Sequence, residues 1–181
     1  MTLSSKPNSI FFAGAVLVLM AGGLCRPASA EADRQNRPNI LWIIAEDNGP
    51  EYGCYGEKLV HTPNVDRLAA EGARFVNAFT STPVCSSSRS SFMTGMFATT
   101  IGAHNHRSHR NDGFMLPEGV HVFTKYLRDA GYFTAICGKG KTDWNFKTRV
   151  KPYDSKNWND LKSHQPFFAQ YQFSETHRRF K

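Results

Sequence analysis

The feature of this sequence that most constrains its fold is a nearly unbroken apolar run at residues 39–45, which contains three isoleucines. A run of this length, rich in β-branched residues, predicts a strand that is buried on both faces, as in a parallel sheet. The run stops at Glu46 and Asp47, and a turn-forming Asn-Gly-Pro sequence follows. Because α/β folds bind ligands at the carboxyl ends of their strands, the two acids are candidates for a binding site. The alternative is that they form a solvated turn.

A helix is predicted over residues 62–72, where a Thr-Pro pair suits a cap and a first turn, and a glycine ends the pattern. Its buried face would consist of Val65, Leu68 and Ala69, which recur at helical spacing.

A second helix is predicted over residues 121–130, and its buried face would be formed by Phe123, Tyr126, Leu127 and Ala130. Further strands are expected at residues 75–79, 132–137 and 166–173, with loops and a short helix within residues 139–165. Strands that alternate with helices predict an α/β fold with a mostly parallel sheet flanked by helices.

Residues 1–30 have the three parts of a secretory signal peptide. A lysine precedes a mainly apolar stretch at residues 10–24, and Ala28-Ser29-Ala30 fits a signal-peptidase site. A membrane anchor is the alternative, but the run is short for a span and no stop-transfer segment follows. A lipoprotein site at Cys25 would need a small residue before it, and a leucine stands there. We therefore expect a periplasmic or secreted protein with no stable membrane anchor, whose mature chain starts at residue 31.

The chain is basic, with a formal net charge of +7 at pH 7. A basic surface suits nucleic acid, but it suits an anionic glycan or small molecule equally, and export favours the latter. Three cysteines follow the signal peptide: Cys54, Cys85 and Cys137. An odd number leaves at least one thiol unpaired or chemically altered. A disulfide between Cys54 and Cys137 remains open at this stage.

Residues 84–95, with the sequence VCSSSRSSFMTG, carry the most chemical information. Small hydroxyl residues after Cys85 suit the start of a helix, where free N–H groups and the helix dipole favour an anion. Arg89 would lie one turn further along the same face. A cysteine in such a position is expected to be reactive. The alternative is a buried cysteine beside a serine-rich loop.

These residues resemble the signature of the sulfatase family, a cysteine-x-proline-serine-arginine sequence followed by a threonine-glycine pair. Cys85, Ser88, Arg89, Thr94 and Gly95 fall on that signature. The resemblance continues, in the same order along the chain, at residues 37–40, 46–47, 62–68, 74–78, 116–119 and 130–134. The branch that the sequence most resembles contains the N-sulfoglucosamine sulfohydrolases and related bacterial glycan sulfatases. The resemblance implies an alkaline-phosphatase-like sulfatase fold and hydrolysis of a sulfate ester or sulfamate on a glycan.

The resemblance also implies two cofactors. Cys85 would be oxidised by a maturase to formylglycine, whose hydrated aldehyde attacks sulfur. A calcium ion would be held by Glu46, Asp47 and the modified residue 85, and it would neutralise the sulfate oxygens and acidify the attacking hydroxyl. Glu46 stands where the family usually has aspartate. Arg89 would hold the formylglycine and share the developing charge.

A sulfate-binding lysine and a general acid are implied as well. Two lysines remain open for the first role, Lys139 and Lys141, and the alternative is that both are solvated loop charges. The histidine that usually stands two residues beyond the lysine is absent, and Lys141 or Asp143 takes its place. His177 would protonate the leaving oxygen or nitrogen, a role that suits imidazole near neutral pH.

His104, His106 and His109 have a spacing that can suggest zinc, but neither cysteines nor a helical register supports a zinc site. We expect this segment to be a substrate-facing or surface loop.

Two departures from the family pattern bear on function. Ser87 stands at the proline position that the maturing enzymes read, so oxidation of Cys85 is expected to need a tolerant maturase or to be inefficient. Residues 31–181 are expected to be the incomplete, amino-terminal part of a sulfatase catalytic domain, because family members continue past this point with further calcium ligands. These residues alone are then expected to bind calcium weakly, and they are not expected to form a complete active site.

Three competing hypotheses remain. The chain could belong to a phosphodiesterase or phosphonate hydrolase of the same superfamily, or it could be a non-catalytic glycan-binding remnant. The third hypothesis is a nucleic-acid-binding protein, and the signal peptide disfavours it.

Overall fold

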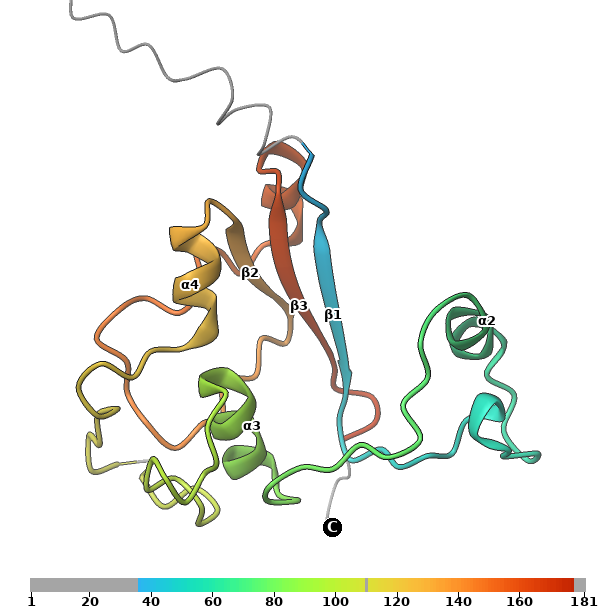
Figure 1. Ribbon diagram of the computed structural model, residues 1–181, viewed down its shortest axis with the longest axis horizontal. Coiled ribbons are helices and arrows are strands. Elements are labelled where there is room, and N and C mark those ends of the chain that lie inside the picture. The colour runs from blue at the N-terminus through green and yellow to red at the C-terminus, as the bar shows by residue number, and fades with distance from the viewer. Residues whose placement is uncertain (1–35, 110, 178–181) are drawn as a thin grey trace, which may run out of the picture.

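The computed structural model describes residues 36–109 and 111–177. At its centre is a three-stranded parallel sheet of β1 (Ile40–Ala45), β3 (Phe167–Phe173) and β2 (Phe133–Gly138), in the order β1-β3-β2 (Figure 1). Because all three strands run in the same direction, their carboxyl ends meet at one edge of the sheet. The predicted α/β class and parallel sheet are confirmed. The predicted signal peptide lies outside the described residues.

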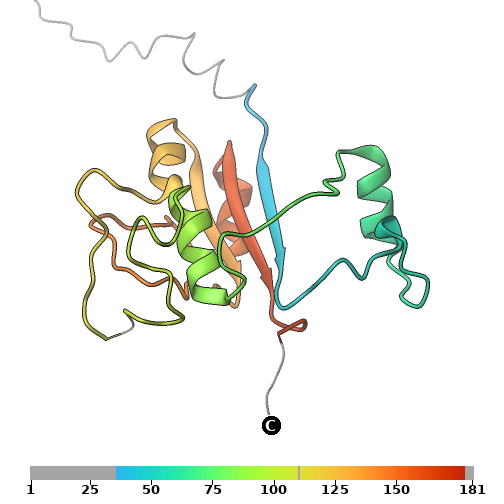
Figure 2. The same cartoon turned by 60° about the horizontal axis from the view of Figure 1, so that its bottom comes forward.

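Helices α3 (Cys85–Thr94) and α4 (Phe123–Asp129) lie on one side of the sheet (Figures 1 and 2). Helix α2 (Pro63–Glu71) and the short 3₁₀ helix η1 (Gly53–Tyr55) lie beyond the β1 edge. A second 3₁₀ helix, η2 (Trp158–Ser163), is the short helix expected within residues 139–165. Across residues 36–109 and 111–177, no helix is both long enough and apolar enough to cross a membrane.

Two clusters of buried side chains cover the two faces of the sheet. Phe168 and Ile136 belong to the larger cluster, which lies under α3 and α4. Their neighbours along the strands, Ala169 and Cys137, point the other way and pack with Leu161 of η2. This alternation buries both faces of β2 and β3, and each fully buried Phe or Ile stabilises the fold by roughly 1.5–3 kcal/mol.

Strand β1 is less buried than its sequence predicts. Leu41 and Ile43 are 47% and 50% exposed, so the prediction of burial on both faces is wrong for the described residues. Trp42 points to the other side and meets the ring of Phe92 at a centroid distance of 4.9 Å. The cause is coverage: β1 and β2 are both edge strands of this sheet, but the cluster around η2 covers β2 and β3 and not β1.

Two further predictions fail around helix α2. Residues 75–79, predicted as a strand, form no strand and are exposed, with Phe79 at 92%. The helix itself forms as predicted, but Val65 and Leu68 are 39% and 60% exposed, so its apolar stripe is not buried. In both segments the apolar pattern is present but not covered: η1 contacts α2 and still leaves Val65 and Leu68 exposed.

Helix α4 falls within the predicted range of 121–130. Phe123 and Leu127 pack against the larger cluster as expected, whereas Tyr126 and Ala130 are exposed. The core therefore contacts a narrower stripe of this helix than the sequence pattern predicts.

In the serine-rich helix α3, side-chain hydroxyl groups are satisfied by carbonyls of the helix's own backbone. Ser90 Oγ donates to the Ser86 carbonyl at 2.7 Å, and Thr94 Oγ1 donates to the Ser90 carbonyl at 2.8 Å. Ser86, Ser87 and Ser90 are fully buried, and their small size lets neighbouring backbone approach the helix closely. Gly95, with φ of 69°, ends the helix in the left-handed conformation that glycine adopts without strain. The helix begins at Cys85, as predicted.

Candidate functional site

A cleft of about 830 Å³ opens at the carboxyl edge of the sheet, between the end of β1 and the start of α3. Five residues proposed from the sequence line it: Glu46, Asp47, Cys85, Arg89 and His177. They come from three segments that are far apart along the chain. The parallel strands and the start of α3 bring them to one place, as the position of the acids after β1 predicts.

Glu46 is the centre of the cleft's electrostatics, with only 6% of its surface exposed. Its Oε1 accepts a hydrogen bond from Lys141 Nζ and lies 3.4 Å from Arg89 Nη2, and its Oε2 accepts from Gln172 Nε2 at 2.9 Å. Burial by itself raises the pKa of Glu46, but the Lys141 hydrogen bond and the charges of Arg89 and Lys141 outweigh it. The pKa therefore lies below its ordinary value of 4.5. The carboxylate is ionised at neutral pH and holds two cations beside it.

Asp47 lies at the turn that follows β1, with a φ of 50°. This left-handed conformation is uncommon for residues other than glycine, although aspartate and asparagine tolerate it better than most. A strained residue that lines a cleft is typical of functional sites, because its neighbours must hold the conformation in place.

Arg89 lies one helical turn after Cys85 and is 4% exposed. Its Nη1 donates to the Lys141 carbonyl at 3.3 Å, and its guanidinium carbon lies 5.7 Å from the centre of the Phe92 ring. Within the described chain its buried Nε has no hydrogen-bond partner. Buried N–H groups are nearly always paired, so an oxygen of a group bound in the cleft is a suitable acceptor.

The three cysteines of the described chain are all free thiols. The disulfide between Cys54 and Cys137 that the sequence leaves open is therefore not formed. Cys137 is buried in β2, and burial raises the pKa of its thiol above the ordinary value of 9.0, which makes it unreactive. Cys85, half-buried in the cleft, is the cysteine placed for chemistry.

The structure separates the two candidate lysines. Lys141 reaches Glu46, which lines the cleft, whereas Lys139 is exposed; neither lysine lines the cleft itself. The turn between β2 and these lysines depends on Gly138, whose φ is 73°. A Cβ atom there would lie 2.9 Å from the Gln172 carbonyl oxygen. Only glycine fits, and the chain then turns so that Lys141 points to the carboxylate.

Three residues near the site were not proposed for it from the sequence. His106 and Arg107 line the cleft, and Gln172 binds Glu46 from the end of β3. His106 belongs to a loop that is expected from the sequence to face the substrate or the surface, and this expectation could have identified it as a residue of the cleft. For Gln172 the signal is a polar side chain that points inward from an apolar strand.

His109 lies outside the cleft and pairs with Asp112, whose Oδ2 is 2.6 Å from its Nδ1. The hydrogen bond with Asp112 raises the pKa of His109 above its ordinary value of 6.5. A raised folded-state pKa means that the protonated ring stabilises the fold below about pH 6.5, and that this contribution is lost as the pH rises through the folded-state value.

We expect an NMR titration of His109 to give a midpoint above 6.5, and the Asp112→Asn substitution to lower that midpoint. Asp129→Asn, which removes a carboxylate on α4 that pairs with Lys125, is the matched control and should leave the midpoint unchanged. An equal midpoint in the wild type and the Asp112 variant would contradict the assignment.

The cleft offers oxygen atoms suited to a hard cation. Glu46 and Asp47 are adjacent carboxylates that line the cleft. Gln172 lies behind them, bound to Glu46 through its Nε2, and its buried Oε1 has no hydrogen-bond donor among the described residues. Calcium takes about six to eight oxygen ligands. Residues 36–109 and 111–177 contain no group of three or more His, Cys, Asp or Glu side chains placed to hold a metal ion. These residues therefore fit calcium in donor chemistry and supply part of a site.

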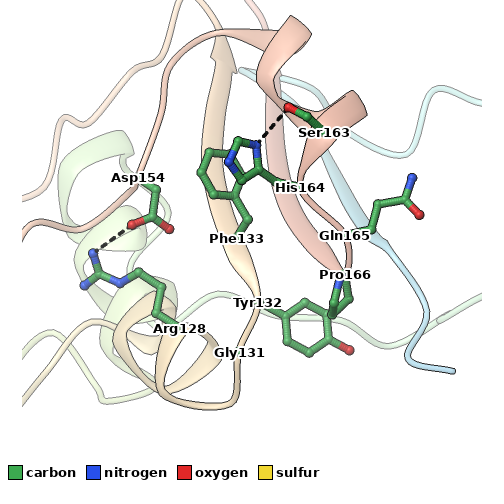
Figure 3. Close-up of a pocket in the computed structure, with 9 residues that line it drawn as sticks. All are labelled: Arg128, Gly131, Tyr132, Phe133, Asp154, Ser163, His164, Gln165 and Pro166. Atoms are coloured by element: carbon green, nitrogen blue, oxygen red, sulfur yellow. Dashed lines mark hydrogen bonds and ion pairs between the residues drawn. The ribbon is translucent and has the colours of Figure 1, made fainter. Parts of the chain in front are cut away.

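A second cavity, of about 430 Å³, lies at the opposite end of the strands, beside the start of β2 (Figure 3). Its polar groups are engaged with one another. Arg128 pairs with Asp154 at 3.6 Å, and the His164 ring stacks on Phe133 at a centroid distance of 4.1 Å (Figure 3). No cysteine lines it, so we assign the chemistry to the cleft at the carboxyl edge.

Comparison with known proteins gives one consistent family. A family model described as Sulfatase matches residues 38–175. An ulvan-active sulfatase from Formosa agariphila is 34% identical over 161 residues, which cover 82% of this chain and 27% of that protein. An N-acetylglucosamine-6-O-sulfatase from Bacteroides thetaiotaomicron is 31% identical over 160 residues, covering 88% of this chain and 26% of the relative. The chain thus spans about a quarter of the length of these relatives.

The fold has a similar counterpart among solved structures. The structure of BT4656 in complex with its substrate D-glucosamine-2-N,6-O-disulfate aligns with a TM-score of 0.61 at 24% identity. The alignment covers 80% of this chain and 36% of that one. At this level of identity the likeness establishes the fold alone.

Proposed function

The chain belongs to the sulfatase family, and on that premise we propose that its gene product hydrolyses a sulfate ester or sulfamate on a sulfated glycan. The observation that carries the proposal is the cleft in which Glu46, Asp47, Cys85, Arg89 and His177 come together. Relatives named for ulvan and for N-acetylglucosamine-6-O-sulfate support a glycan as the substrate class. The pattern of residues 1–30 supports export to the periplasm or the medium.

We propose that Cys85 is converted to formylglycine by a maturase. The maturase would use an external oxidant to turn the Cβ carbon into an aldehyde, and the sulfur would leave. The hydrated aldehyde supplies a hydroxyl nucleophile for sulfur. A free, half-buried thiol at the start of a helix that lines the cleft supports this assignment.

Ser87, at the proline position of the family signature, does not disturb the helix. It is the third helical residue, and the backbone N–H groups of the first turn have no acceptor within a helix. Serine and proline are therefore both compatible with this backbone position. The departure bears on recognition by the maturase, which we propose to tolerate serine.

The charge of each remaining side chain determines the role that we assign to it. Glu46 and Asp47, with the modified residue 85, would hold a calcium ion, which supplies Lewis-acid stabilisation of the sulfate oxygens. Arg89 would bind the nucleophile and share the charge that develops in the transition state. Lys141, which reaches Glu46, is placed better than Lys139 to bind the sulfate. His177 would donate a proton to the leaving atom.

The proposal predicts that residue 85 of the gene product, co-expressed with a formylglycine-generating enzyme, carries an aldehyde. Mass spectrometry of the peptide that contains residue 85 checks the modification, and an aryl sulfate assay checks the turnover. Cys85→Ala should lower turnover by at least about a thousandfold, as loss of a nucleophile does. Cys54→Ala is the control, since this thiol lies in η1 and does not line the cleft.

An unmodified thiol at residue 85, together with full turnover by the Cys85 variant, would refute the proposal. An aryl phosphodiester serves as the second substrate in the same assay. Faster turnover of the phosphodiester would assign the protein to the phosphodiesterase or phosphonate hydrolase class instead.

A further inference from the structure

The loop that carries His106 and Arg107 is tied to helix α3 by partly buried hydrogen bonds to two serines of the helix. Ser87 Oγ donates to the His104 carbonyl at 2.8 Å, and the Arg107 backbone N–H donates to Ser86 Oγ at 2.8 Å. Ser86 and Ser87 are fully buried in α3, directly after Cys85. The loop therefore holds its place relative to the nucleophile position without a ligand.

Asn145 fixes the same loop from the other side. It is 1% exposed, and its Nδ2 donates to the Ala103 carbonyl at 3.0 Å and to the Asn105 carbonyl at 2.5 Å. Its backbone N–H donates to Ser90 Oγ at 2.9 Å, which ties the segment back to α3. Buried bonds of this kind preorganise a binding surface, so that less ordering is lost when a ligand binds.

The Arg107 guanidinium is oriented by Asp143. Its Nε and Nη2 lie 3.3 Å and 3.2 Å from the same oxygen, Asp143 Oδ2. The Arg107 side chain is 40% exposed and lines the cleft. A guanidinium carries five N–H donors, and the bonds to Asp143 leave the Nη1 side without a partner among the described residues. The φ of 54° at Arg107 is a further sign that the backbone is held to present this side chain.

Asp143 stands at the position where the family resemblance leads us to expect a histidine, two residues after Lys141. A carboxylate there can form an ion pair with Arg107, which an imidazole cannot do. The departure from the family pattern thus has a structural consequence: it directs an additional permanent cation into the cleft. Arg89 is assigned to the nucleophile and the group that is cleaved, which leaves Arg107 for a different anionic group.

We propose that Arg107 is a specificity-determining residue that binds a second anionic substituent of the glycan, a sulfate or a carboxylate next to the group that is cleaved. This inference rests on the proposed function and names its substrate class. The planar fork of arginine matches the oxygens of either anion with two parallel hydrogen bonds.

His106 lies beside the subsite. Its Nδ1 is 3.0 Å from the buried Ser86 hydroxyl, which also accepts from the Arg107 backbone N–H, and either atom of the Ser86–His106 pair could be the donor. Ser86 therefore links the His106 ring to the backbone of Arg107, and both His106 and Arg107 line the cleft.

Isothermal titration of the calcium-loaded gene product carrying Cys85→Ala, which cannot turn substrate over, tests the inference. Three probes are compared: glucosamine 6-O-sulfate, glucosamine 2-N,6-O-disulfate and a 6-O-sulfated disaccharide that contains a uronate. We expect at least one doubly anionic probe to bind about tenfold more tightly than the monosulfate, because a charge-assisted hydrogen bond contributes that much. The probe that gains affinity identifies the second anion as sulfate or carboxylate.

Arg107→Ala should abolish this preference while it leaves the affinity for the monosulfate nearly unchanged, and Arg107→Lys should restore part of it. Arg128→Ala is the matched control, since Arg128 also pairs with an aspartate but lines the cavity at the opposite end of the strands. An equal loss for all three probes would overturn the inference, because Arg107 would then contact the sulfate that is cleaved. No loss for any probe would overturn it as well.

The result is independent of the proposed chemistry, because binding to the Cys85→Ala variant requires no formylglycine. If the matured wild type failed to hydrolyse an aryl sulfate while the preference for two anions remained, the proposed function would fail and the anion subsite would stand.

Discussion

Replacing Arg89 by alanine is expected to lower the sulfatase turnover of the matured gene product by about 100- to 1,000-fold, and replacing it by lysine should recover little of the loss. Arg89 is almost completely buried, lies one turn after Cys85, and has an Nε without a partner among the described residues. Removal of one preorganised donor at a developing negative charge typically has an effect of this size. Lysine keeps the charge but lacks the planar set of donors, so it cannot make the same bonds. Steady-state kinetics with an aryl sulfate give the measurement.

Arg149→Ala is the control for this prediction, because Arg149 donates to the Leu116 carbonyl at 2.7 Å and does not line the cleft. Thermal unfolding of each variant separates a loss of catalysis from a loss of structure. Glu46 keeps Lys141 as a partner when Arg89 is removed, so we expect the Arg89 variants to remain folded. Full activity of Arg89→Lys would show that a point charge suffices and would contradict the need for the planar set of donors of arginine.

The parts of the fold that could be predicted depend on local patterns. The apolar run of β1, the acids that follow it and the small residues after Cys85 each indicate a local conformation without reference to the rest of the chain. Parallel strands then bring their carboxyl ends together, which is why Glu46 and Asp47 could be placed at a binding edge from the sequence. That Cys85 and Arg89 belong to the same site was implied by the family resemblance, and the cleft brings all four together.

The features of the fold that could not be predicted depend on contacts between segments that are far apart in the sequence. Leu41 and Leu68 have the spacing of buried residues, but burial requires an element packed over their side chains, and in the described residues they stay 47% and 60% exposed. The choice between Lys139 and Lys141 depends on the left-handed turn at Gly138, which residue counting does not resolve. Arg107 reaches the cleft through an ion pair with Asp143, 36 residues further along the chain. The periodicity of apolar residues along a helix or strand does not indicate a contact of this kind.

Replacing Glu46 by glutamine is expected to destabilise the protein by about 3–5 kcal/mol at neutral pH, measured by urea unfolding in the presence of a chelator. Glu46 is 6% exposed, and its carboxylate is the shared partner of Arg89 and Lys141. Removing one member of a buried ion pair leaves the opposite charge uncompensated, which is the origin of a cost of this size. Glu118→Gln, which removes an exposed carboxylate, should change the unfolding free energy very little.

The pH dependence of the unfolding free energy, compared between the wild type and Glu46→Gln, separates the contribution of the Glu46 charge from that of its shape. Because neighbouring cations hold the pKa of Glu46 below 4.5, its ionised form stabilises the fold above that pH. The contribution is lost as the pH falls through the lower folded-state value. The wild type should therefore lose stability between about pH 5 and the folded-state pKa, whereas Glu46→Gln should lose much less over that interval, since the amide does not titrate. If the unfolding free energies of the two proteins fell in parallel as the pH was lowered, the charge of the carboxylate would contribute nothing to stability, and packing would hold Glu46 in place. If the unfolding free energy fell more steeply at acid pH in the wild type alone, the cleft would contain an ionised acid at the end of β1. An ionised acid there is the condition for a cation to bind.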